Sequence, residues 1–206
     1  ETEYALSALA DSGTIADWAQ PYVKTVYSKR YMVGDEQNRF LPEMALTRGA
    51  AVKIITLMLE NETYIKNNPT ISNSGASHRN TVFTNNVTVG SGVGDGTVTF
   101  GNCRVLGTLT VNGGGSNSGV VLRDSQVGTL AVSKDKGDAN VVATGNTLVK
   151  EAVLSRGCHL EESSLTGEGF TKVSLSGGHL EEGTVRLSGL FTQVDVSSSA
   201  LIRGGD

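Results

Sequence analysis

The most regular feature of the chain is a short apolar segment that recurs about every 21 residues. Its two outer residues are apolar and the residue before it is polar, the period-two alternation of a strand with one buried face. Successive segments begin 22, 21, 22, 21 and 21 residues apart; they are residues 87–89, 109–111, 130–132, 152–154, 173–175 and 194–196. A strand kept in phase over this period predicts a solenoid.

Two further apolar segments lie between successive copies of the first. Second segments lie near Val98, Val120, Val141, Leu160, Leu180 and Leu201, and third segments near Val105, Val127, Leu148, Leu165 and Val185. Three short strands per turn, joined by glycine-rich bends, predict a parallel β-helix with turns about 4.8 Å apart. Because parallel crossovers in one sheet are overwhelmingly right-handed, we expect a right-handed helix. The left-handed hexapeptide helix is the alternative, but no six-residue rhythm is present.

One corner of this β-helix carries a polar repeat of its own. Asn102, Asp124 and Asn146 recur at 22-residue intervals just before the third strand. Asn and Asp bond to neighbouring backbone in turns, so we expect the three to stack as a ladder.

The composition changes sharply around residues 60 to 70. Trp18 and all five tyrosines precede residue 65, as do two of the three prolines, while only three of the 26 glycines fall before residue 70. We therefore predict two domains, a helical module over residues 1–62 and a parallel β-helix over residues 63–206. The last segment, near Leu201, resembles part of a further turn, so we expect a piece of a longer protein.

The helical module contains two predicted helices. The first spans residues 17–30 with Asp17 as its N-cap and an apolar stripe of Trp18, Tyr22, Val23, Val26 and Tyr27. The second spans residues 47–59 with Thr47 as its N-cap and a buried stripe of Ala51, Ile54, Ile55 and Met58. Two helices and a loop in about 60 residues give only a thin core.

The same module carries a pattern of spaced residues in two halves. One half is Asp11, Ile15, Trp18, Ala19, Pro21, Tyr22 and Val23, and the other is Gly34, Asp35, Phe40, Pro42, Leu46, Thr47 and Arg48. Over about residues 6–59 the pattern resembles one repeat of the S-layer homology (SLH) domain. The resemblance implies a non-catalytic anchor on the outside of a bacterium, in its cell wall or S-layer. It also implies that three repeats form a pseudo-threefold unit.

The resemblance implies a partner and a site as well. The partner is a secondary cell-wall polysaccharide, often one bearing pyruvate ketals, together with neighbouring SLH repeats or other S-layer subunits. The polysaccharide-binding candidates are Thr47, Arg48, Trp18, Gly34 and Asp35. A ketal carboxylate suits an Arg fork beside a helix N-terminus, which is where Arg48 lies. The alternative for Arg48 is an exposed side chain that meets only water or Glu43.

The chain departs from the family pattern just after Arg48. The family has Thr-Arg-Ala-Glu, in which Thr and Glu form a capping box. Here Gly49 and Ala50 occupy the last two places, so the return bond to the cap is lost. This repeat is then either a binding site or a structural member of a set whose other repeats bind.

An acidic pattern on the β-helix offers different chemistry. His159, Glu161, His179 and Glu181 recur at a 20-residue interval, so on adjacent turns they would stack. Such a cluster suits a divalent metal, and two close carboxylates suit a retaining glycosidase. A solvated stack of surface residues is the default in a solenoid. We therefore predict no metal site, no cofactor and no catalytic residue.

Absences in the β-helix sequence also argue against an enzyme. Sugar-binding clefts usually present Trp or Tyr, and neither occurs after residue 64. The loops are short, with residues 113–119 the longest glycine-rich corner, so we expect no walled groove. A polysaccharide lyase, a glycoside hydrolase or a carbohydrate-binding module remains the alternative to a surface protein.

Net charge, apolar runs and cysteines limit the kinds of partner that we expect for this chain. The net charge of −4 gives no basic patch, so we expect no nucleic-acid partner. No apolar run reaches the ~18 residues of a membrane-spanning helix. Cys103 and Cys158 lie 55 residues apart, and we expect two buried thiols rather than a disulfide.

Overall fold

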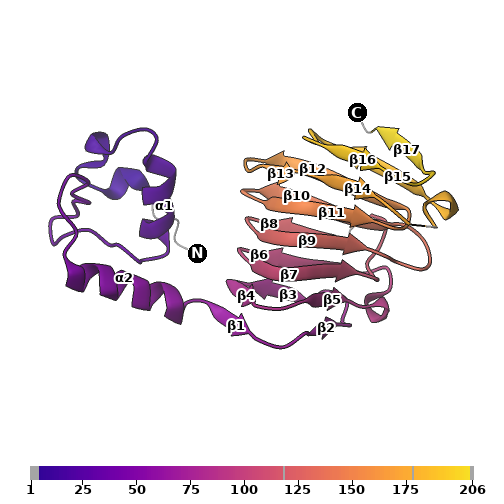
Figure 1. The fold of residues 1–206 in the computed structure, drawn as a ribbon. Coiled ribbons are helices and arrows are strands. Elements are labelled where there is room, and N and C mark those ends of the chain that lie inside the picture. The colour runs from indigo at the N-terminus through magenta and orange to yellow at the C-terminus, as the bar shows by residue number, and fades with distance from the viewer. Residues whose placement is uncertain (1–4, 118, 178, 205–206) are drawn as a thin grey trace. The chain divides into compact units, whose positions relative to one another are not determined.

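The computed structural model describes residues 5–117, 119–177 and 179–204, and the chain divides into two compact units between Glu62 and Thr63 (Figure 1). The first unit is helical, with α1 (Gln20–Ser28), α2 (Arg48–Glu60) and the short 3-10 helices η1 (Leu6–Ala8) and η2 (Ser12–Thr14). The second unit is a parallel β-helix of about 21 residues per turn, as the repeat predicts.

The core of the helical unit is small. Its buried side chains are Leu9, Ile15, Val23 and Tyr27, with Leu6, Ala19 and Phe40 packed at the edge. Helix α1 is shorter than predicted, because residues 16–19 form a turn and Ala19, not Asp17, is the N-cap. The predicted buried stripe is also wrong in part, since Trp18 and Tyr22 are 77% and 69% exposed.

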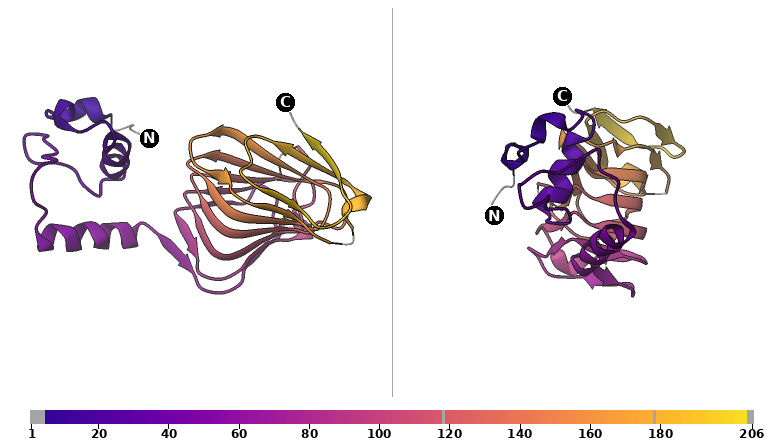
Figure 2. Two further views of the ribbon diagram at one scale, coloured as in Figure 1. Left: turned by 45° about the horizontal axis from the view of Figure 1, so that its top comes forward. Right: turned by 90° about the vertical axis from the view of Figure 1, so that its left-hand side faces the viewer.

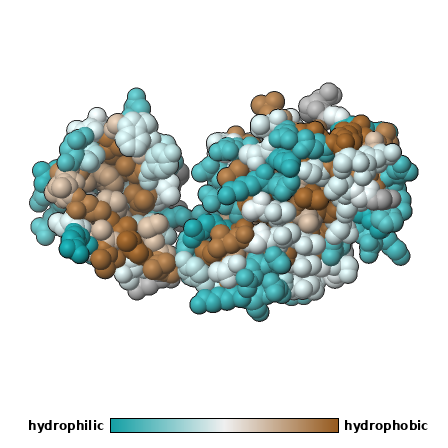
Figure 3. Space-filling model, viewed as in Figure 1, coloured by the Kyte–Doolittle hydropathy of each residue, from teal (hydrophilic) through white to brown (hydrophobic). Residues whose placement is uncertain are grey.

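Helix α2 begins where the sequence predicts, with Thr47 as its N-cap. Its predicted buried stripe is wrong, because Ile55 and Met58 are exposed and Ala51 and Ile54 are only partly covered. The unit offers α2 little besides the loop around residues 30–46 to pack against. Figure 3 shows apolar side chains gathered on the visible face of this unit, over α2.

The strands of the second unit form two sheets of ten and seven strands, all paired in parallel. The larger sheet contains β1 (Thr63–Ile65), β2 (Thr70–Ile71), β4 (Thr81–Phe83), β5 (Val87–Val89), β7 (Arg104–Val111), β9 (Gln126–Val132), β11 (Leu148–Leu154), β13 (Gly169–Phe170), β14 (Val173–Leu175) and β16 (Val194–Val196). The smaller contains β3 (Ser77–Arg79), β6 (Val98–Gly101), β8 (Val120–Arg123), β10 (Ala139–Gly145), β12 (Cys158–Leu165), β15 (Thr184–Ser188) and β17 (Leu201–Gly204). Figure 2 shows the stacked turns from two further directions.

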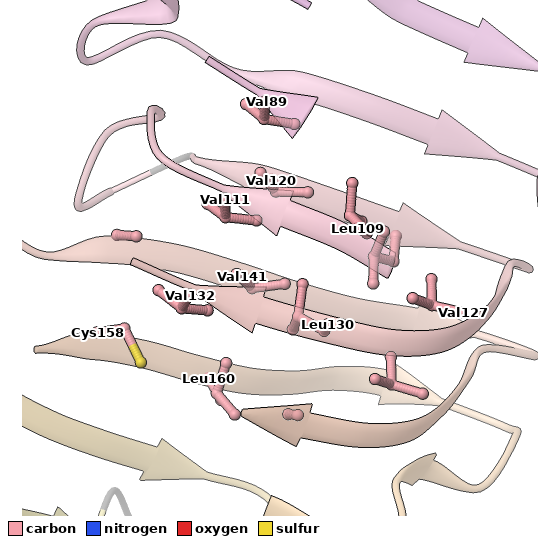
Figure 4. Packing of buried hydrophobic residues seen from close by; sticks show 14 of the residues in the cluster. Val89, Leu109, Val111, Val120, Val127, Leu130, Val132, Val141, Cys158 and Leu160 are labelled. Carbon is pink, nitrogen blue, oxygen red and sulfur yellow. The ribbon is translucent and has the colours of Figure 1, made fainter. Parts of the chain in front are cut away.

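The register of the larger sheet confirms the predicted phase. Val87, Leu109, Leu130, Ala152, Val173 and Val194 pair one after another along the sheet. The first five of these residues are fully buried, and the close-up in Figure 4 shows Leu109 and Leu130 inside the coil, between the two sheets. Cys103 and Cys158 are buried free thiols, and burial raises the pKa of Cys158 to about 12.

The other two predicted segments differ from the structure in three ways. The third segment runs straight into the next first segment, so β7, β9 and β11 are long strands and the coil has two sheets rather than three. Its buried member after Val127 is Val149 rather than Leu148. Leu180 is not in a strand but in the 3-10 helix η4 (Leu180–Glu182), and Leu160 pairs with Leu187 instead.

The predicted polar corner ladder is present but starts one turn earlier. Asn80, Asn102 and Asp124 all have φ of 50°, the left-handed geometry that Asn and Asp tolerate. The Asn102 amide donates to Asn80 Oδ1 at 2.8 Å. Asn146 joins through its backbone, since its N–H donates to Asp124 Oδ1 at 2.9 Å, and Gly145 takes the left-handed position.

Candidate functional site

The start of α2 presents backbone donors and a cation together. The Thr47 hydroxyl accepts a hydrogen bond from the Ala50 N–H at 3.1 Å, as an N-cap does. No acidic side chain lies in the first turn, and Arg48 is exposed. Among the described residues Arg48 has no ion-pair partner, and Glu43 does not pair with it. This helix end is therefore positive, through its dipole and through Arg48.

Gly34 and Asp35 shape the loop that precedes α2. Gly34 has φ of 79°, and a Cβ there would meet the Arg39 carbonyl oxygen at 2.8 Å. Asp35 Oδ1 accepts two backbone bonds, from Gln37 and Arg39, and Oδ2 accepts bonds from Nε and Nη2 of the Arg39 guanidinium at 2.9 and 2.7 Å. Arg39 thereby holds the pKa of Asp35 below its ordinary value. The structure gives both candidates a role in holding the loop.

Asp11 ties this loop to the N-terminal segment, although the sequence does not mark it as a site residue. Its carboxylate oxygens accept the N–H groups of Phe40 at 2.7 Å and Leu41 at 2.8 Å. Desolvation raises the pKa of Asp11, but these backbone bonds outweigh it, so the pKa lies below its ordinary value. Asp11 belongs to the family pattern, but its separation of 29 residues from Phe40 does not show that the two are in contact.

Loss of the Asp11 charge is expected to loosen the loop. A carboxyl whose pKa is lowered on folding stabilises the fold above its unfolded pKa, near 3.9, and loses that effect as pH falls below it. Hydrogen exchange at Phe40 and Leu41 should therefore become faster, relative to intrinsic rates, as pH falls from about 5 to 3. In Asp11→Asn, hydrogen exchange at these two amides should already be faster at pH 6 than in the unmodified chain. Unchanged protection in Asp11→Asn would contradict the tether, and Asp17→Asn is the matched control.

A pocket of about 360 Å³ lies between α2 and this loop, and it gathers cations that the sequence did not single out. Gly34 and Asp35 line it, but Thr47, Arg48 and Trp18 do not. Arg30, Arg39 and Lys53 also line it, so the lining carries three cations and one carboxylate among mostly apolar side chains. The sequence signal that could have marked Arg39 is its spacing, four residues after Asp35. The balance of charge in the pocket suits an anion.

Trp18 lies apart from that pocket but on an exposed surface. It lies in the turn before α1, Tyr22 lies in the first turn of α1, and both rings are mostly exposed. Two exposed aromatic side chains are suited to contact with a sugar face.

The metal candidates on the β-helix are not brought together as predicted. His159 lies on β12, pairs with Arg186 of β15, and its Nε2 lies 2.8 Å from Ser188 Oγ. His179 is the N-cap of η4 and Glu181 lies within η4, so neither residue is in a strand. The predicted stack is wrong because the step from Leu160 to its partner Leu187 is 27 residues, and the insertion that contains η4 takes up the excess.

The carboxylates next to these candidates have structural partners. Glu162 accepts the N–H groups of Phe170 at 2.9 Å and Leu190 at 2.8 Å. Glu182 bonds to His179 at 2.8 Å and to Arg156, and the His179 bond lowers the pKa of Glu182. In the described ranges no group of three His, Cys, Asp or Glu side chains has metal-binding geometry.

The β-helix carries a groove that the sequence analysis did not anticipate. A groove of about 840 Å³, which we call the corner groove, crosses the turns that follow β2, β5, β7 and β9. Its lining includes Thr70, Thr88, Asn112, Ser133, Asp95 and Lys136. The turn around η3 (Ser91–Val93) and the loop after β9 also line it. Turn lengths in the sequence do not show that the loops after β5, β7 and β9 stack at one corner.

Comparison with known proteins places the family of the first unit. Residues 9–52 match the model of the S-layer homology domain, the segment that contains α1, the loop and the start of α2. Neither the curated proteins nor the solved structures contain a match to the chain. No helix in the described ranges has the length and apolar character needed to cross a bilayer. An SLH domain implies anchoring at the cell surface or cell wall.

Proposed function

We propose that this chain, whose residues 9–52 are an S-layer homology domain, is a non-catalytic surface protein that binds an anionic cell-wall polysaccharide. The β-helix serves as a rigid spacer, lattice element or adhesive surface. The observation that carries the binding proposal is the positive start of α2, with Arg48 exposed beside the capped helix end. Pull-down on purified wall, before and after removal of its secondary polysaccharide, tests it: binding that survives removal contradicts it.

The departure from the family pattern supports an anion at this helix end. A Glu in place of Ala50 would put a negative charge in the first turn of α2. With Gly49 and Ala50 instead, the helix dipole and Arg48 are not offset there. A carboxylate on the polysaccharide, such as a pyruvate ketal, can take the place of that Glu.

The exposed apolar face of α2 supports assembly with further repeats or with other S-layer subunits. Val52, Ile55 and Leu59 are each more than half exposed, and Met58 is 41% exposed. A small unit that leaves one helix uncovered gains stability from a partner. The SLH resemblance implies that neighbouring repeats provide it.

A spacer role is supported by the sheets of the β-helix. Parallel pairing runs without a break from β3 to β17 in the smaller sheet. Each turn packs an apolar interior against the next, from Phe83 to Val185. Such solenoids behave as rods, because each repeat contacts its neighbours alone.

We predict that the protein neither hydrolyses nor eliminates glycans. Glu162 is occupied by backbone donors, and Glu161 lies opposite Ser188 rather than a second carboxylate. Incubation with plant, bacterial and fungal polysaccharides should release no reducing ends and no unsaturated products. Product formation that Glu161→Gln abolishes, and Glu168→Gln does not, would establish an enzyme.

A further inference from the structure

The corner groove has a floor built from successive turns of the β-helix. Thr70 and Thr88 pair across β2 and β5, and the backbone bonds of Asn112 to Val89 and of Ser133 to Val111 continue the same corner. The four residues stand on consecutive turns, so the floor is roughly 14 Å long at the strand spacing. A Cβ at Gly113 would clash with the carbonyl oxygen of Gly90, so glycine is needed for the close approach of these two turns.

Charged side chains hold in place the loop after β9, which lines the groove beside this floor. The Lys134 side chain is 11% exposed, and its Nζ donates to the Gly114 carbonyl at 2.7 Å. The same Nζ lies 3.7 Å from the carboxylate of Asp95, in the loop that follows η3. Asp135 pairs with Arg156 at 3.4 Å. A groove fixed in this way loses little entropy when a ligand enters.

Each side chain that lines the groove carries a polar group. Its side chains are hydroxyl, amide or charged groups, and the remaining positions are glycines. Lys134 and Lys136 balance Asp95 and Asp135, so the groove favours neither a polyanion nor a polycation. Among the residues that the structure describes, no apolar side chain lines it to anchor a hydrophobic peptide or a lipid.

Hydrogen-bonding groups on the floor are available to a ligand. The Ser133 hydroxyl donates to Asn112 Oδ1, which turns the Asn112 amide nitrogen toward other acceptors. Within the described ranges, neither that nitrogen nor the Thr88 hydroxyl has a protein partner. A row of such groups on consecutive turns matches a chain that itself carries hydroxyls at regular intervals.

We propose that the corner groove binds a neutral oligosaccharide lying along the axis of the β-helix. The site is distinct from the start of α2 and does not rest on the anchoring proposed there. Because no aromatic ring stacks on the sugar, affinity comes from hydrogen bonds, which gain little over water, and is weak. Density of sites on a wall surface compensates for weak single contacts.

Amide chemical-shift mapping of the full chain tests this. The probes are a glucose hexamer linked β-1,4, an N-acetylglucosamine hexamer with the same linkage, and a serine hexapeptide. Saturable shifts at Gly90, Asn112 and Ser133 with at least one sugar are expected. No shift there with either sugar, stronger shifts there with the peptide, or shifts confined to residues 30–60 would overturn the site.

A double variant separates binding from folding. Asn112→Leu with Ser133→Ala removes both partners of one hydrogen bond, so neither is left unsatisfied. It should weaken sugar binding by about tenfold or more, the loss of roughly two net hydrogen bonds. Ser176→Ala, at the equivalent corner two turns later, is the control and should bind as the unmodified chain does. Equal affinity of the double variant and the unmodified chain would overturn the groove.

Discussion

Val132→Asp is expected to unfold the β-helix, because it places a carboxyl group inside the apolar coil. Val132 is 1% exposed and stacks between Val111 and Leu154 in the larger sheet (Figure 4). The change removes a buried apolar side chain, at about 1.5–3 kcal/mol, and buries a carboxyl without a partner, at several more. A loss above about 4 kcal/mol is a large part of the 5–15 kcal/mol that stabilises a domain.

Circular dichroism and thermal unfolding measure this effect. The neighbouring residue Ala131 points outward from the same strand and is partly exposed, so Ala131→Asp is the matched control. Thr129 also points outward but lies opposite Glu151, where a second carboxylate would repel. A cooperative transition in Val132→Asp within a few degrees of the control would contradict the assigned register.

Arg48→Ala is expected to weaken binding to pyruvylated wall polysaccharide by roughly 10- to 100-fold. A charge-assisted hydrogen bond is worth about 1.5–3 kcal/mol, and 1.4 kcal/mol is a factor of ten in affinity. The fork of Arg48 and the free amides at the start of α2 would hold the same carboxylate. Arg48→Lys keeps the charge but loses the two-pronged guanidinium, so its affinity should lie between those of Arg48→Ala and the unmodified chain.

The measurement must allow for weak binding by a single repeat. Titration calorimetry or a wall-sedimentation assay should therefore use this chain linked to two further copies of residues 5–62 as well as alone, because linked sites raise avidity. Arg123→Ala, an exposed arginine at the end of β8, is the matched control and should change nothing. If Arg48→Ala binds as tightly as the unmodified protein, the site lies elsewhere, and the cationic pocket around Lys53 is the next candidate.

Local patterns in the sequence account for much of the architecture. The strand phase from Val87 to Val194 follows from a repeat that differs by no more than one residue between turns. The cap at Thr47 needs only its own helix start. The SLH assignment also rests on spaced residues within one short segment, and the family match confirms it.

Features that depend on long-range packing were decided by the tertiary structure alone. The exposure of Trp18 and Ile55 reflects how little the small unit can bury, which helical periodicity does not report. His179 does not stack on His159 because Leu160 pairs with Leu187, 27 residues later, rather than with Leu180. Only the backbone pairing shows that the extra residues lie outside the sheet. The corner groove arises where short loops from successive turns stack at one corner of the coil. Periodicity records which residues point inward, but the distance between separate loops is set by how the whole coil closes.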